Sequence, residues 1–191
     1  MDRKAHLQLD PAVAVAANPV SWGVFEKTED DPLLPGPELV LDQIQAAGYG
    51  GTELGPPGFF GDADTLRARL IARRLSLVGA FLPLRFSRAE HAADDRAWMA
   101  GVLDLLADGT PDAVRPKAIL ADASLEPERM RWAGQIGEHP EAALQPERLP
   151  VLIDNLHRAG ELAQSRGFDA VLHFHAGSYV ETFDEIRRVM D

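Results

Sequence analysis

Short apolar segments alternate with longer segments of helical period along this chain, and this alternation constrains the fold more than any other feature. The apolar segments, which we predict to be strands, are residues 13–23, 51–55, 75–84, 117–123 and 169–177. The segments that we predict to be helices are residues 35–48, 62–74, 89–109, 146–167 and 182–191. A helix after every strand returns the chain to the same end of the sheet, so the strict alternation predicts a parallel α/β sheet.

The ends of the predicted helices carry separate signals. Asp62 can cap the amino end of one helix, and Gly109 and Gly167 can close the carboxyl ends of two others. Thr182 and Glu185 stand three residues apart, which is the spacing of a capping box that would open the last helix. These local signals agree with the apolar periodicity, because each one falls where a helical pattern begins or ends.

Two architectures are built from strands and helices that alternate in this way. An open doubly wound sheet usually carries a glycine-rich phosphate-binding turn after its first strand, but the turn here reads NPVSWG. A (β/α)8 barrel instead places polar and aromatic side chains at the carboxyl ends of its strands. The predicted strands end near such residues, namely Trp22, Glu53, Arg85, Asp122 and the pair His173 and His175. We therefore predict a TIM-type barrel of which about five β/α units are present.

The composition narrows the class of protein. With 191 residues and 46% hydrophobic content, the chain can bury the core of one globular domain. The net charge of −11 argues against a nucleic-acid partner, and the absence of cysteine excludes disulfides and thiol catalysis. The first apolar run is broken by Asn18 and Pro19 before it could form a signal peptide, and no run is long enough to span a membrane. We expect a cytoplasmic protein without nucleic-acid or membrane partners.

Four motifs resemble the successive strand ends of one enzyme family. These are NPVSWG, AGYGGTELGPPGFF, LSLVGAFLPL and HFHAGSYVETFDEI, and the resemblance runs from about residue 13 to the end. They are similar to the sugar isomerases and epimerases with a xylose-isomerase-like barrel, and within that family to the inosose (keto-inositol) dehydratases. The resemblance implies a TIM barrel, a divalent metal, and a small sugar or inositol-derived substrate. It favours Mn²⁺ or Co²⁺ as the metal, with Mg²⁺ or Zn²⁺ as alternatives.

The resemblance also implies that part of the barrel is missing. Relatives continue into three further strand–helix units that carry additional metal ligands, and those ligands are absent here. The 191 residues are fewer than the roughly 250 that a complete barrel usually needs. We therefore expect residues 1–191 to form a single xylose-isomerase-like domain that is truncated at its C-terminal side.

His173 and His175 are the strongest candidates for chemistry. Residues two apart share one face of a strand, so both rings should point into the barrel mouth while Leu172 and Phe174 pack under the helices. A neutral imidazole can bind a borderline metal or exchange a proton near neutral pH. By resemblance, His173 occupies the position of a metal ligand, and His175 would be the catalytic acid or base. The alternative is that the pair only fills the interior of the barrel.

Three other side chains are candidates for the same site. Glu53 would orient substrate hydroxyls or act as acid or base, and its alternative is a buried ion pair. Trp22 offers an apolar wall for the carbon face of a polyol, and its alternative is a core aromatic. Glu181 would contact substrate, unless it sits in the first turn of the last helix, where the helix dipole favours an acid.

Two further residues at strand ends are predicted to be structural. Asp122 is best explained as a residue that caps the loop after the fourth strand. Arg85 could meet a phosphate or carboxylate, but a solvated arginine is the simpler interpretation. Neither residue is therefore assigned to the predicted site.

The reaction that we predict is metal-assisted enolisation of a ketone, followed by loss of water as in an inosose dehydratase. The first alternative is an isomerase or epimerase, which forms the same enediolate but returns the proton elsewhere. The second alternative is that the chain is an inactive partial barrel or fragment. Its sheet would then have unpaired edges, and we expect such a chain to self-associate as a homo-oligomer.

Overall fold

The computed structural model describes residues 14–25, 31–111 and 115–190. In this part of the chain one parallel sheet of five strands runs in the order of the sequence. The strands are β1 (Ala16–Ala17), β2 (Gly51–Glu53), β3 (Ser76–Leu84), β4 (Lys117–Asp122) and β5 (Ala170–His173). The parallel α/β sheet is therefore confirmed, and its strand order is that of neighbouring strands in a (β/α)8 barrel.

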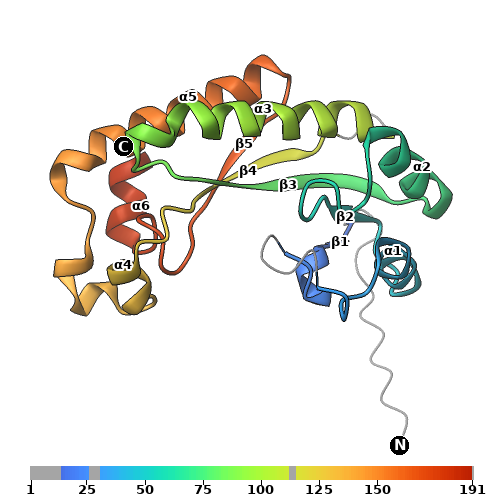
Figure 1. Ribbon diagram of the computed structural model, residues 1–191, viewed down its shortest axis with the longest axis horizontal. Helices are drawn as coiled ribbons and strands as arrows, with labels where there is room; N and C mark the ends of the chain where they lie inside the picture. Colours follow the sequence, from blue (N-terminus) through green and yellow to red (C-terminus); the bar gives the residue numbers. More distant parts are fainter. Residues whose placement is uncertain (1–13, 26–30, 112–114, 191) are drawn as a thin grey trace, which may run out of the picture.

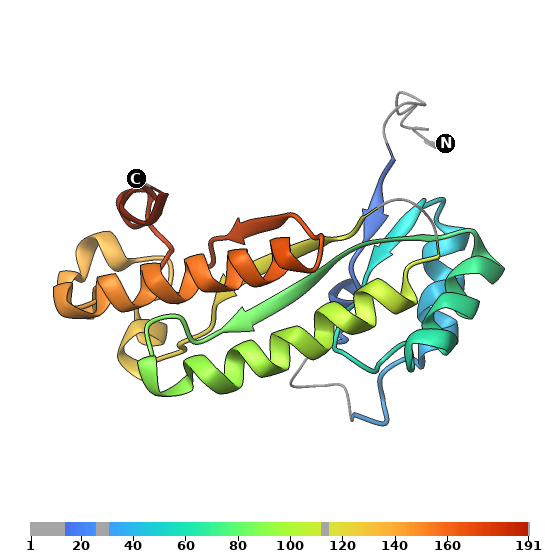
Figure 2. The same cartoon turned by 90° about the horizontal axis from the view of Figure 1, so that it is seen from above.

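The helices follow the strands in turn. The α-helices are α1 (Pro37–Ala46), α2 (Ala63–Arg73), α3 (Ala92–Gly109), α4 (Pro127–Arg131), α5 (Leu149–Ser165) and α6 (Phe183–Met190). Short 3-10 turns lie at η1 (Pro19–Trp22), η2 (Ala89–His91), η3 (Ile136–Glu138), η4 (Pro140–Ala142) and η5 (Pro146–Arg148). Helices α3 and α5 lie side by side over one face of the sheet (Figures 1 and 2). Among the described helices, none is both long and apolar enough to cross a membrane.

Two of the predicted helix starts are confirmed, at α2 and α6, and Gly167 follows α5 with a positive φ of 81°, whereas Gly109 is itself the last residue of α3. The Asp62 side chain accepts a hydrogen bond from the Thr65 backbone N–H at 2.9 Å and so caps α2. At α6, the Thr182 N–H donates to the Glu185 carboxylate at 3.0 Å, and the Glu185 N–H donates to the Thr182 hydroxyl at 3.3 Å. This reciprocal pair is the capping box, so local chemistry alone sets where these helices begin.

The hydrophobic core lies between the sheet and its helices. In β3, Ala80, Leu82 and Leu84 are buried toward this layer, whereas Phe81 between them is only partly buried and lines the opposite face. The helices contribute further buried side chains, namely Leu66 and Leu70 from α2, Met99, Leu103 and Leu106 from α3, and Leu152 and Ala159 from α5. The other face of β3 therefore presents Phe81 to the candidate site and does not pack into this core.

The first strand is shorter than predicted. Val13, where the prediction begins, lies outside the described residues, and β1 ends at Ala17. The Asn18 side chain accepts a hydrogen bond from the Val20 N–H and Pro19 has no N–H to offer a neighbouring strand, so the chain turns into η1. Trp22 therefore ends a 3-10 turn and not a strand.

The fifth strand is also shorter than predicted. It ends at His173, and the His175 N–H donates to the Val180 carbonyl at 3.2 Å instead of to a neighbouring strand. Phe174 therefore does not pack under the helices, and its side chain is 59% exposed. Alternation of faces applies only while a strand continues, which explains this wrong prediction. The predicted last residue of α6, Asp191, lies outside the described part of the chain.

Candidate functional site

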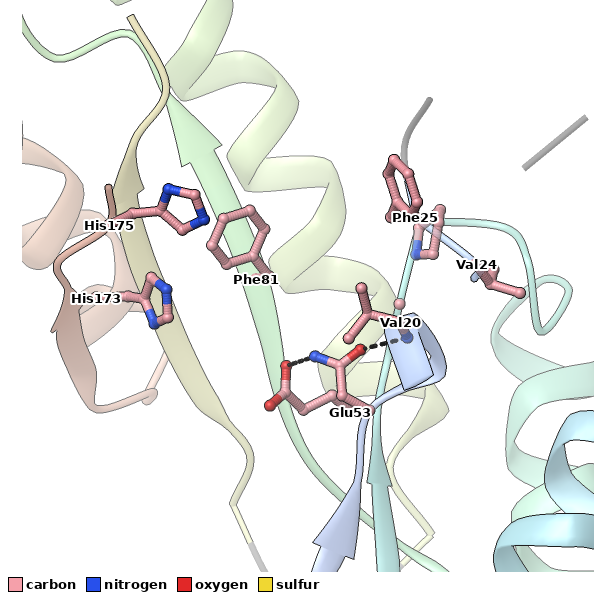
Figure 3. Close-up of a pocket in the computed structure, with 10 residues that line it drawn as sticks. Val20, Val24, Phe25, Glu53, Phe81, His173 and His175 are labelled. Atoms are coloured by element: carbon pink, nitrogen blue, oxygen red, sulfur yellow. Dashed lines mark hydrogen bonds between the residues drawn. The ribbon is translucent and has the colours of Figure 1, made fainter. Parts of the chain in front are cut away.

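A cavity of about 400 Å³ opens at the carboxyl ends of the strands. This volume lies in the range of small-molecule sites in proteins. Of the residues predicted for the site, Glu53, His173 and His175 meet there, and Trp22 and Glu181 do not line it. Figure 3 shows Glu53 and the two histidines on opposite sides of Phe81. The complete lining is Asn18, Val20, Val24, Phe25, Glu53, Gly55, Pro56, Phe81, His173 and His175.

Glu53 is the last residue of β2, next to an irregularity where the register against β3 shifts. Its Oε2 accepts a hydrogen bond from Nδ2 of Asn18 at 2.8 Å. Burial raises the pKa of the Glu53 carboxyl above its usual value, and the Asn18 hydrogen bond offsets part of this rise. Among the described residues the Glu53 carboxylate makes no ion pair, and its only side-chain partner there is the neutral amide of Asn18.

The two histidines form the opposite wall. The His173 ring stands edge-on to Phe81, with ring centroids 5.6 Å apart, and lies 5.8 Å from the His175 ring. Partial burial, and to a smaller extent His175, lowers the pKa of His173, so its imidazole is neutral at neutral pH. A neutral imidazole has one unprotonated nitrogen, which can accept a proton or bind a metal.

A tight turn holds His175 in place. Nδ1 of His175 lies 2.7 Å from the Ala176 carbonyl oxygen, which can only accept, so Nδ1 is the donor of this hydrogen bond and Nε2 is left to contact a ligand. The Ser178 N–H donates to the His175 carbonyl at 3.0 Å. From β4, the buried carboxylate of Asp122 accepts from the Tyr179 N–H at 2.8 Å. Asp122 therefore fastens this turn to the sheet.

Asp122 also accepts a hydrogen bond from the Ser124 hydroxyl at 2.7 Å, which agrees with its predicted role as a loop cap. Burial raises the pKa of its carboxyl. The prediction that Arg85 is only solvated is wrong. Its guanidinium makes an ion pair with Asp95 near the start of α3. Both residues are thus engaged in structural contacts outside the cavity lining.

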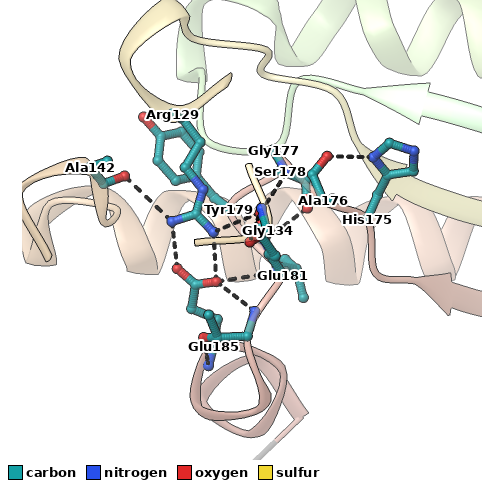
Figure 4. A network of polar contacts seen from close by, with 12 residues as sticks. Arg129, Gly134, Ala142, His175, Ala176, Gly177, Ser178, Tyr179, Glu181 and Glu185 are labelled. Carbon is teal, nitrogen blue, oxygen red and sulfur yellow. Dashed lines mark hydrogen bonds and ion pairs between the residues drawn. The ribbon is translucent and has the colours of Figure 1, made fainter. Parts of the chain in front are cut away.

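Glu181 belongs to a buried polar network on the far side of that turn (Figure 4). One of its carboxylate oxygens accepts from the Gly134 N–H at 2.8 Å, and the other accepts from the Gly177 N–H. Arg129 lies beside it and makes two hydrogen bonds to the Glu185 carboxylate, at 2.8 and 2.7 Å. We call Arg129, Glu181 and Glu185 the α4–α6 network. In this conformation Glu181 is held by backbone donors and not presented to the cavity.

Trp22 likewise lies outside the cavity lining. Its indole Nε1–H donates to Oε1 of Gln43 in α1 at 2.5 Å, and its ring packs against the core. This position matches the alternative interpretation of Trp22 as a core aromatic.

A metal site is not completed by the described residues. Nowhere in residues 14–25, 31–111 and 115–190 do three His, Cys, Asp or Glu side chains come close enough to hold an ion. The cavity offers the two imidazoles on one side and the Glu53 carboxylate on the other. These donors alone do not fit a divalent metal with the usual coordination, and the assignment of His173 as a ligand stays a prediction.

Several lining residues were not predicted from the sequence. For one of them a sequence signal exists, because Asn18 follows an apolar run directly before a proline. Phe81 lies in a segment that is apolar at both alternating sets of positions, so only the structure shows that it faces away from the core. The others come from loops whose course depends on packing, and no sequence pattern identifies them. They are Val20, Val24, Phe25, Gly55 and Pro56.

Comparison with known proteins finds sequence relatives of the kind that the motifs resemble. No family model matches the chain. An inosose dehydratase of Geobacillus kaustophilus is 29% identical over 185 residues, which cover 91% of this chain and 54% of that protein. The chain thus spans about half the length of the curated relatives that it matches.

Solved structures support the fold. A xylose-isomerase-like TIM barrel protein from Mycobacterium smegmatis, in complex with magnesium, superposes with a TM-score of 0.60 at 16% identity, over 94% of this chain and 60% of that one. An L-ribulose 3-epimerase superposes with a TM-score of 0.59 at 16% identity, over 94% of this chain and 58% of that one. The chain is therefore similar in sequence to inosose dehydratases, and its five-stranded sheet has the fold of part of a TIM barrel.

Proposed function

We propose that the cavity binds a small keto-polyol or sugar, and that the protein removes a proton beside the ketone and then eliminates water. The observation that carries this proposal is the meeting of Glu53, His173 and His175 around one cavity at the carboxyl ends of parallel strands. In barrels of this kind, catalytic groups come from the ends of several different strands. The sequence similarity to inosose dehydratases supports elimination as the reaction.

The side chains of the cavity can serve both proton transfers that elimination needs. A base takes the proton from the carbon next to the carbonyl, and the electron pair forms the enediolate. The hydroxyl on the next carbon then leaves as water, after it receives a proton from an acid. Glu53 has a raised pKa, which suits a group that gives and takes protons, and His173, whose pKa is lowered, can act as a base. We propose His175 as the second group that exchanges a proton. Phe81 and Val20 provide apolar surface for the carbon skeleton.

A second candidate is an isomerase or epimerase. Epimerisation needs a base on one face of the carbon and an acid on the other, and Glu53 lies across Phe81 from the histidines (Figure 3). The epimerase among the structural neighbours supports the shared fold. Both candidates begin with the same enolisation and differ only in where the proton and the hydroxyl go.

For the metal, we propose only that a divalent ion binds in the cavity and that His173 is one of its ligands. One structural neighbour was crystallised with magnesium, and a divalent ion would polarise the carbonyl when it is bound. His173 is the residue that we propose as a ligand, with Mn²⁺ or Co²⁺ as the predicted ion. Because the described residues bring no three donors together, the proton transfers above are assigned only to the side chains of this chain.

The test is to incubate the purified chain with a keto-inositol and to follow absorbance in the near ultraviolet, where a dione product absorbs. A rising absorbance supports elimination, whereas interconversion of ketoses without a chromophore moves the assignment to the isomerase. Two-dimensional NMR of the histidine side chains reports binding independently of turnover. If keto-inositol and ketoses leave the His173 and His175 signals unchanged and no product forms, the inactive partial barrel is the correct interpretation.

A further inference from the structure

We propose that Asn18 is a positioning residue that holds one oxygen of Glu53, so that the other carboxylate oxygen remains open to a ligand in the cavity. The contact is made by the side-chain amide of Asn18, which donates from Nδ2 to Oε2 of Glu53 at 2.8 Å. The use of this arrangement in catalysis rests on the proposed function. The arrangement itself depends only on the contacts of Asn18 with Glu53 and Val20 and on the close approach of Gly55 to Pro19.

The orientation of the Asn18 amide is set by a second contact. Oδ1 of Asn18 accepts the Val20 backbone N–H at 2.9 Å and caps η1. A rotation of the amide by 180° would lose this cap and would place Oδ1 against the Glu53 carboxylate, so that two acceptors would meet. The Asn18 amide therefore has one favourable orientation, in which the donor faces Glu53.

The backbone brings the two residues together. Pro19 follows Asn18 as the first residue of η1, where its missing N–H costs nothing. The loop after β2 passes close to this proline, and a β-carbon at Gly55 would lie only 3.0 Å from Cγ of Pro19. Gly55 also has a φ of 66°, which favours glycine. The close approach of these two strand ends places Glu53 within reach of Asn18.

The result is a carboxylate with two different oxygens. Oε2 accepts from Asn18, and Oε1 accepts no hydrogen bond from any described residue, although Glu53 lines the cavity. The other titratable side chains of the cavity lining are His173 and His175, which lie across Phe81. Oε1 is thus the atom of Glu53 that is available to accept a substrate hydroxyl or a proton.

The test measures the pKa of Glu53 by NMR titration of the side-chain carboxyl in the full chain labelled with ¹³C-glutamate. Asn18→Asp keeps an acceptor for the Val20 N–H but replaces the donor with a like charge, so the pKa of Glu53 should rise by about one pH unit or more. Asn18→Ser also keeps an acceptor for the cap but removes the amide donor without adding charge. It should give a smaller rise, and it decides the question if Asn18→Asp does not fold.

The matched control is Gln43→Glu. It adds the same charge near η1 and keeps an acceptor for the Trp22 indole, but Gln43 does not line the cavity. This variant should leave the pKa of Glu53 unchanged. An unchanged Glu53 pKa in the folded Asn18 variants would overturn the proposal. Because no substrate is used, an inactive chain that still shows the shift would reject the proposed function and leave the role of Asn18 intact.

Discussion

The cavity and the α4–α6 network both contain glutamate carboxylates, but the carboxylates in the network have hydrogen-bond donors for both oxygens and the one in the cavity does not. In the network, Arg129 is 1% exposed and binds both oxygens of Glu185, while each oxygen of Glu181 accepts a backbone N–H. In the cavity, Glu53 has a single neutral donor for one of its oxygens. The carboxylates of the network therefore hold loops together, whereas the Glu53 carboxylate in the cavity keeps one oxygen available to a ligand.

The pKa directions of the two carboxylates follow from this difference. Burial alone would raise the pKa of Glu185, but the hydrogen bonds from Arg129 and from the backbone of Thr182 and Glu181 outweigh it, and the pKa is lowered. Burial raises the pKa of Glu53, and the one hydrogen bond from Asn18 is too little to reverse it. Both groups are partly buried, so the number and charge of the donors decide which carboxylate stays ionised and which can exchange protons.

The largest expected effect tests the structural half of this comparison. Arg129→Met leaves Glu185 and Glu181 without their buried cation, so we expect the free energy of unfolding in urea to fall by roughly 3–5 kcal/mol. Arg158→Met removes an exposed pair with Asp154 and should leave the unfolding midpoint nearly unchanged. Equal losses in the two variants would show that the α4–α6 network does not stabilise the fold.

The next effect concerns the functional half. If the chain turns over a keto-polyol, Glu53→Gln should lower kcat on the order of 10²-fold, because the amide cannot transfer the proton. Circular dichroism should show the fold of the parent, since the amide oxygen can still accept from Asn18. Turnover at the rate of the parent would remove Glu53 from the reaction and leave only the histidines as candidates.

A smaller effect separates the two histidines. Titration calorimetry with Mn²⁺ or Co²⁺ should show weak binding to the parent chain, because the described residues bring no three donors together. His173→Ala should weaken this binding by at least about tenfold if His173 is a ligand, and His175→Ala should weaken it less. Equal affinities in the parent and both variants would mean that the imidazoles do not bind metal and that only their proton chemistry remains to be tested.

The smallest effect is the pH dependence of stability at Glu53. A raised pKa means that the folded state binds this proton more tightly than the unfolded state, so the contribution of Glu53 to stability falls as pH rises through and above 4.5. Glu53→Gln should therefore be slightly more stable than the parent at pH 7, and the difference should shrink as the pH is lowered toward 4. Thermal melts across this range measure it. A variant that is less stable than the parent at pH 7 would contradict the raised pKa.

Much of the fold is determined by local sequence. Residues within a few positions of one another form the Asp62 cap and the Thr182–Glu185 box, and α5 buries Leu152, Ala159 and Ala163, which recur at helical spacing in the sequence. The strict alternation of strands and helices then leaves a parallel sheet as the solution. The same alternation predicts that strand ends gather at one edge, which is why Glu53, His173 and His175 could be placed at one site in advance.

The details of the site depend on contacts between residues that are far apart in the chain. Glu181 faces Gly134, 47 residues away, and Asn18 meets Glu53, 35 residues away, so neither pairing leaves a local pattern. The predicted ends of the first and fifth strands lie beyond the observed ends for the same reason. The backbone leaves the sheet where another hydrogen-bond partner competes, and the Val180 carbonyl is that partner for the His175 N–H. The sequence by itself determined which side chains reach the ends of the strands. Only the tertiary structure decided which of them are saturated by donors and which face an open cavity, because hydrogen bonds between distant segments form only when the chain has packed.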